Sequence, residues 1–187
     1  MALDLEFILQ RVRELAFKYE KENRGCAQAC LAALQDVMGV RDDNVFRSAS
    51  GLSGGAGLTT LGSCGALSGG VMAIGLFFGR ERAEFKDPEK KRMIAYRLSK
   101  ELSEKFIERY GSVVCREIQK NYLGRSYNLW SPEDYISFDK VAYQGNKCPE
   151  LVAQAAVWAA RIILDELERT GKTKIIEAIY ENARRIQ

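Results

Sequence analysis

The sequence contains no histidine among its 187 residues. This absence excludes a Ser-His-Asp triad, a Cys-His dyad, a histidine-ligated zinc and a histidine-ligated haem. A large charge excess is also lacking: 28 Lys and Arg against 25 Asp and Glu leave a net charge of +3, too little for a dedicated nucleic-acid binder. A hydrophobic fraction of 47% excludes a disordered chain. The remaining chemistry rests mainly on carboxylates, tyrosines and five cysteines.

The N-terminal segment also lacks the pattern of a secretory signal. It carries acidic residues from position 4 onward and no continuous apolar run before a small-residue cleavage site. We therefore expect a cytoplasmic protein, in which cysteines are thiols, metal ligands or catalytic groups. An odd count of five does not fit a fully paired disulfide scaffold.

No charged residue occurs between positions 48 and 79. Residues 60–79 are long enough to span a bilayer, but five glycines interrupt them and their first half is small and polar rather than apolar. We expect a buried, glycine-rich central helix here and no stable membrane span, because glycines let neighbouring helices approach closely. The same glycine face is also compatible with a homodimer.

Helical periodicity dominates the rest of the chain. No segment alternates with a period of two over the length of a strand. We predict an all-α fold, orthogonal or bundle-like, with a single domain over 1–187 that includes an N-terminal helix in 1–22 and a C-terminal helix in 172–187. The further helices are expected at 23–38, 64–78, 87–110, 112–122 and 149–169, with a helical or turn segment at 43–49 and a capped start at Ser131.

Four of the five cysteines fall at predicted helix N-termini: Cys26, Cys64, Cys115 and Cys148. Unpaired N–H groups and the helix dipole stabilise a thiolate at such a position. Basic residues beside three of them are expected to act in the same direction, namely Arg24, Arg116 and Lys147. We predict that the four cysteines share one thiolate site. Cys30 lies one turn inside its helix and is expected to be a small core residue.

Other motifs give weaker signals. The stretch Gly55-Ala56-Gly57 begins like a dinucleotide fingerprint, but Thr60 replaces the third glycine and no strand precedes it. The GKT at 171–173 lacks the first glycine of a Walker loop, because Glu166 stands there. We expect no nucleotide site. We expect the acidic residues of the helices to lie on solvated faces, and we assign none of them as a general acid. Examples are Glu101, Glu104, Glu108, Asp165, Glu166 and Glu168.

The cysteine pattern resembles a known family. The run from Cys64 to Gly69 reads CGAxxG and follows a glycine loop at 51–57; Cys26 stands in CAQACLAAL, Cys115 in GSVVCREI and Cys148 in NKCPELV. Over residues 23–168 the chain is similar to the C_GCAxxG_C_C family, which is distantly related to the split-Soret cytochrome domain. The resemblance implies four redox-active cysteines in a cytoplasmic protein and no established substrate.

The chain departs from the family in two positions, and it lacks the groups that haem would need. Leu58 stands where a basic residue is expected after the glycine loop, and Cys30 is an additional thiol. Without histidine or a CxxCH site, no haem is expected.

Three functions remain open at this stage. The four cysteines could exchange thiols and disulfides with a reductase or another redox protein. They could instead be metal ligands, holding an iron-sulfur cluster or zinc, although tight CxxC pairs are absent. In the third hypothesis the protein is a non-enzymatic helical interaction module. The aromatic segment 122–143, which joins Cys115 to Cys148, could cover the site or simply pack a long connection.

Overall fold

Most of the long helices of this protein form where apolar residues recur at helical spacing. The computed structural model describes residues 4–186, and within them it contains nine α-helices and no β-strand. The predicted all-α class is confirmed. The long helices are α1 (Leu5–Asn23), α2 (Cys26–Met38), α4 (Gly65–Phe78), α5 (Arg92–Tyr110), α8 (Lys147–Arg169) and α9 (Thr173–Arg185). The short ones are α3 (Asp43–Ser48), α6 (Cys115–Ile118) and α7 (Pro132–Asp139).

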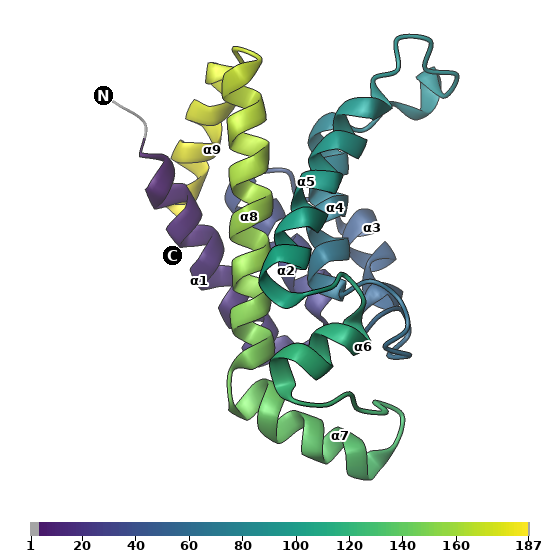
Figure 1. The fold of residues 1–187 in the computed structure, drawn as a ribbon. Helices are drawn as coiled ribbons and strands as arrows, with labels where there is room; N and C mark the ends of the chain where they lie inside the picture. Colours follow the sequence, from purple (N-terminus) through teal and green to yellow (C-terminus); the bar gives the residue numbers. More distant parts are fainter. Residues whose placement is uncertain (1–3, 187) are drawn as a thin grey trace.

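Helix α8 is the common neighbour of the main bundle. It packs against α1, α2, α4 and α5, while α1 also packs against α2. The long helices run roughly side by side, and α7 crosses one end of the bundle with α6 close above it (Figure 1). The predicted terminal helices correspond to α1 and α9; positions 1–3 and 187 of those ranges lie outside the described residues. The single-domain organisation over 1–187 remains a prediction.

Helix α4 is the glycine-rich central helix that the sequence predicts. A Cβ atom on Gly69 would overlap the carbonyl oxygen of Ala27 in α2, and one on Gly70 would lie 2.8 Å from Leu102 and 3.2 Å from Ala159. These glycines therefore allow α4 to pack closely against α2, α5 and α8 within the chain. Among residues 4–186, no helix combines the length and the apolar character that crossing a bilayer requires.

Several helix starts differ from the prediction, and the start of α5 differs most. A helix was expected to start at Asp87, but α5 begins at Arg92. Asp87 has a φ of +49°, which a right-handed helix does not accommodate. Its carboxylate accepts hydrogen bonds from the backbone amides of Lys91, at 2.7 Å, and Arg92, at 3.1 Å. The residue thus satisfies the first amides of α5 from outside the helix.

The apolar side chains form two separate clusters. The main core fills the space between the long helices. A smaller cluster lies in the part of the chain around α7 and contains Tyr127, Leu129, Phe138 and Ala142, with Cys148 packed against it. Cys26 packs against the main core instead. Residues of both clusters line one cavity, which the predicted cysteines also line.

Candidate functional site: a cysteine-lined cavity

The structure brings the four predicted cysteines to one place. Cys26 is the first residue of α2, Cys64 is the N-cap of α4, Cys115 is the first residue of α6 and Cys148 is the second residue of α8. All four line a cavity of about 220 Å³, here called the cysteine cavity. Its walls also include Glu20, Leu58, Gln119, Phe138, Tyr143 and Leu151. Cys30 does not line it and is fully buried in the core, as predicted.

Backbone pairing holds Cys64 and Cys115 on neighbouring segments. Their flanking residues Ser63 and Val114 form an isolated antiparallel bridge. The amide of Cys64 donates to the carbonyl of Val113 at 2.8 Å, and the amide of Cys115 donates to the carbonyl of Gly62 at 2.9 Å. These contacts hold the backbones of Cys64 and Cys115 beside each other at the starts of α4 and α6.

Glycines allow the other segments to approach the sulfurs. A Cβ on Gly65, the residue after Cys64, would overlap Sγ of Cys26. A Cβ on Gly55 would lie 3.0 Å from Cβ of Cys115, and Gly55 has a φ of +74° that favours glycine. The glycine loop predicted to turn tightly beside Cys64 therefore forms one wall of the site.

The segment 122–143 covers the cavity from the side of the smaller apolar cluster. Its residues Tyr122, Leu123, Tyr135, Phe138 and Tyr143 all line the cavity. The ring of Phe138 packs edge-on against Tyr143 with centroids 5.7 Å apart. Apolar and aromatic groups thus line much of the cavity, in which Cys64 is buried and Cys26, Cys115 and Cys148 are half-buried.

Burial determines the protonation of the four thiols. It raises the pKa of Cys64 and of Cys115 to about 12, and it raises the pKa of Cys26 and of Cys148 as well. Interaction with the other cavity cysteines adds to each increase. At Cys64 the amides of Ala66 and Leu67, at the start of α4, lower the pKa, but burial outweighs them. The predicted positions at helix N-termini are confirmed, whereas the predicted thiolates are wrong.

The basic residues beside three of the cysteines do not offset the increase in thiol pKa that burial causes. The guanidinium of Arg24 pairs with Asp139 at 2.6 Å and stacks on the ring of Tyr143, 3.5 Å from its centroid. The remaining two cations also have other partners: Arg116 pairs with Glu117 at 3.2 Å, and the ammonium of Lys147 lies 4.8 Å from the ring centroid of Tyr122. The expectation that these cations stabilise thiolates is therefore wrong.

Glu20 is the site residue that the sequence reasoning missed. It is 0% exposed and lines the cysteine cavity together with Cys26 and Cys148. Oε1 accepts a hydrogen bond of 3.0 Å from the hydroxyl of Tyr143, but Oε2 is buried without a hydrogen-bond partner. Burial raises the pKa of Glu20 from its ordinary value of 4.5 to about 7, although Tyr143 and Arg24 both lower it.

A second acidic residue also corrects the prediction. Glu166 was assigned to a solvated face, yet it is only 3% exposed. Its carboxylate pairs with Arg169 at 2.6 Å and with Arg97 at 2.8 Å. These partners hold its pKa at about 2, far below the value of Glu20. Glu166 lies outside the cysteine cavity and stabilises the fold by ion pairing.

The cysteine cavity does not form a compact metal site. Within residues 4–186, no group of three or more Cys, Asp or Glu side chains lies close enough together to hold one metal ion. The four thiols line the walls of a space rather than converge on one point. The metal-ligand alternative for Cys26, Cys64, Cys115 and Cys148 therefore does not fit this arrangement.

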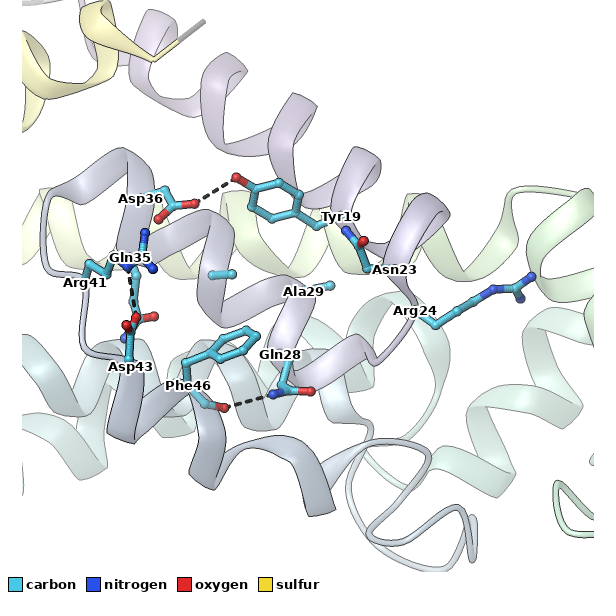
Figure 2. A pocket seen from close by; sticks show the side chains of 11 residues that line it. Tyr19, Asn23, Arg24, Gln28, Ala29, Gln35, Asp36, Arg41, Asp43 and Phe46 are labelled. Carbon is cyan, nitrogen blue, oxygen red and sulfur yellow. Dashed lines mark hydrogen bonds and ion pairs between the residues drawn. The ribbon is translucent and has the colours of Figure 1, made fainter.

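A second hollow, of about 320 Å³, lies on another face of α2 and contains no cysteine. Figure 2 shows Tyr19 pointing toward Asp36, whose carboxylate accepts its hydroxyl at 2.8 Å, and Arg24 extending away from the other side chains. The side-chain amide of Gln28 donates to the carbonyl of Phe46 at 3.2 Å. These polar groups of the hollow thus hydrogen-bond to one another, and no cysteine lines it. The cysteine cavity is therefore the better candidate for the functional site.

Comparison with protein families agrees with the cysteine pattern. A family model described as "Putative redox-active protein (C_GCAxxG_C_C)" matches residues 25–162. This range includes the four cavity cysteines. No curated protein and no solved structure gives a significant match.

Proposed function

Since the chain belongs to the C_GCAxxG_C_C family, we propose that it is a redox protein whose cysteine cavity carries out thiol–disulfide exchange. The reacting residues are Cys26, Cys64, Cys115 and Cys148. The observation that carries this proposal is their shared location: four cysteines from four helix starts, separated by up to 122 positions, line one cavity.

The reaction uses two cavity thiols and the disulfide of a partner. One thiol loses its proton and its sulfur attacks the partner disulfide, so that a mixed disulfide forms and one partner thiolate leaves. A second cavity thiol, on losing its proton, attacks the mixed disulfide and releases the other partner thiol. The protein is oxidised by two electrons to a disulfide, and the partner is reduced to two thiols.

The size and lining of the cavity indicate the class of partner. A volume of about 220 Å³ is smaller than the roughly 300–1,000 Å³ of drug-sized ligand sites. It accommodates a small disulfide or a single side chain from a reductase or another dithiol protein. A reducing cytoplasm would return the oxidised protein to the thiol state that all five cysteines have in this structure.

Thiol counting in defined redox buffers tests the proposal. Protein purified without oxygen is equilibrated over a range of dithiol-to-disulfide ratios, quenched with acid and counted for free thiols. We expect a reversible loss of thiols in pairs, which Cys64→Ser reduces and Cys30→Ala, a substitution outside the cavity, leaves intact. An unchanged thiol count across the whole range would contradict the proposal.

The same sample distinguishes the other two functions. Iron or zinc in stoichiometric amount after purification without added metal would favour the metal-ligand alternative, despite the wide arrangement of the thiols. If Cys64→Ser changes stability but no redox property, the protein is better described as a helical interaction module. The homodimer that the glycine face of α4 first indicated has less support, because those glycines pack within the chain.

A further inference from the structure

Thiol exchange in this cavity faces a chemical obstacle. The attacking species in thiol–disulfide exchange is the thiolate, yet burial keeps the four cavity cysteines protonated. The three neighbouring cations have other partners. A group inside the cavity that accepts the thiol proton as a sulfur attacks would remove this obstacle.

Glu20 has the position and the free atom for this role. Its side chain is completely buried in the cavity wall, and Tyr143 holds one carboxyl oxygen while the other has no hydrogen-bond partner. A buried carboxyl oxygen without a partner is costly for the fold. Such a cost at a functional site is typical of a group that bonds to a reactant rather than to the resting protein.

We propose that Glu20 is the proton acceptor of the cysteine cavity: its free Oε2 takes the thiol proton of Cys26 or Cys148 as that sulfur attacks a disulfide. The inference rests on the proposed exchange function and adds a residue to it. The S–H bond breaks, a proton moves to Oε2, and the sulfur electron pair forms the new S–S bond. The protonated carboxyl then gives its proton to the departing thiolate of the partner.

Several ionisable groups surround Glu20 and define its electrostatics. Tyr143 donates to it, and Arg24, which is paired with Asp139, lies near enough to lower its pKa. The charge of Glu20 raises the pKa of Cys26 and of Cys148 more than any other charged group does. At Cys64 the charge of Cys115 raises the pKa more than that of Glu20 does, and Glu20 does not contribute to the pKa of Cys115. Tyr135 also lines the cavity.

Because the charge of Glu20 acts on both Cys26 and Cys148, the direction in which Glu20→Gln changes their reaction rates distinguishes two roles of Glu20. If Glu20 acted only through its charge, removing that charge would lower the pKa of Cys26 and Cys148 and make both thiols react faster. If Glu20 accepts the proton, Glu20→Gln makes them react more slowly. The two roles thus predict changes in opposite directions.

The test is alkylation by iodoacetamide, resolved by residue with peptide mass spectrometry, between pH 5.5 and 9. In the reduced wild-type protein we expect the rates at Cys26 and Cys148 to rise with a midpoint near pH 7, as Glu20 loses its proton. In Glu20→Gln the midpoint should vanish and both rates should fall by about 10²-fold at pH 8, a typical contribution of a general base. The rate at Cys115 serves as the internal reference and should be unchanged. Equal or faster reaction of Cys26 and Cys148 would overturn the proposal.

Two further variants keep the test decisive. Tyr143→Phe removes the hydroxyl that favours the Glu20 carboxylate, so the midpoint of the alkylation profile should move to higher pH. An unchanged midpoint would also overturn the proposal. This variant therefore tests the proposal even where Glu20→Gln fails to fold. Glu166→Gln makes the same chemical change at another buried glutamate outside the cavity and should leave the alkylation profile in place. Circular dichroism checks that each variant is folded.

The result is separable from the fate of the proposed function. If wild-type protein shows no reversible thiol loss in redox buffers, the exchange function fails whatever Glu20 does in the alkylation assay. If wild-type protein exchanges thiols and Glu20→Gln exchanges them at the same rate and pH dependence, only the role of Glu20 fails.

Discussion

The hydroxyl of Tyr143 donates a hydrogen bond of 3.0 Å to Oε1 of Glu20, across 123 positions of the chain. The contact joins the end of α1 to the segment that covers the cysteine cavity. It orients a carboxyl group that has no exposed surface and leaves its second oxygen without a partner. Two residues that the sequence places in unrelated segments thereby form one polar contact of a site whose lining also includes Arg24, Ser53 and Gln119.

Glu20 should make the folded protein less stable as the pH rises. Its pKa is 4.5 when it is solvated and about 7 in the fold, so the folded state retains a proton that the unfolded chain releases. The free energy of unfolding therefore falls between pH 4.5 and about 7, by about 3 kcal/mol from this group. Urea unfolding of the reduced protein at several pH values measures the loss. Glu20→Gln should lack it, and parallel curves for the two proteins would contradict the assignment.

Two glycines of α4 offer a matched comparison for packing between the helices. Gly69→Ala should destabilise the protein by about 1–3 kcal/mol, because the added methyl overlaps the carbonyl oxygen of Ala27 and lies 3.0 Å from Cβ of Cys30. Gly75→Ala in the same helix meets no atom within 4 Å and should stabilise it by up to about 1 kcal/mol. Thermal unfolding of both variants measures the contrast. Equal effects would show that close contact between α2 and α4 is not what Gly69 provides.

Local patterns in the sequence were sufficient to predict much of the fold. Helical periodicity predicted α1, α2, α8 and α9 because each presents one apolar face to the bundle. An uncharged, glycine-rich apolar run predicted α4. The start of α5 was misplaced, because a proline after Asp87 resembles an ordinary helix start. The left-handed φ of Asp87, which moves the start to Arg92, is a property of tertiary context.

The cysteine positions could be predicted, but their chemistry could not. Cap residues, a proline and glycines mark the helix starts near the cysteines, so their placement follows from sequence. The pKa of a thiol depends on how deeply the fold buries it, and at Cys64 burial outweighs the amides of α4. That balance depends on covering residues from 122–143, whose position over the cavity no local pattern indicates.

Glu20 did leave a signal that the sequence reasoning overlooked. The buried face of α1 runs through Ile8, Val12 and Ala16, and position 20 continues that series at the same spacing of four. An acid in register with the apolar face of an amphipathic helix is a candidate for a buried, perturbed carboxyl. Its neighbours in sequence, Tyr19 and Lys21, made it look like part of a polar helix end.

The native thiols should react slowly despite their positions at helix N-termini. Burial raises the pKa of Cys115 from 9.0 to about 12, so the thiolate fraction at pH 8 is about 10²- to 10³-fold smaller than in the unfolded chain. Iodoacetamide should therefore label Cys115 slower by that factor in buffer than in 6 M urea, and Cys30, which has no exposed surface, should be labelled only after unfolding. Rapid labelling of native Cys115 at pH 7 would show that a nearby group stabilises its thiolate.

Glu166 should respond to pH in the direction opposite to Glu20. Its hydrogen bonds to Arg169, at 2.8 and 2.6 Å, and the ion pair with Arg97 lower its pKa from 4.5 to about 2. The stabilisation is present above pH 4.5 and is lost as the pH falls toward 2, because the unfolded chain takes up the proton first. Glu166→Gln should cost about 1–3 kcal/mol at pH 7, and the difference from wild type should shrink as the pH falls below 4.5. A difference that stays constant down to pH 2.5 would show that side-chain packing, not the charge of Glu166, is responsible.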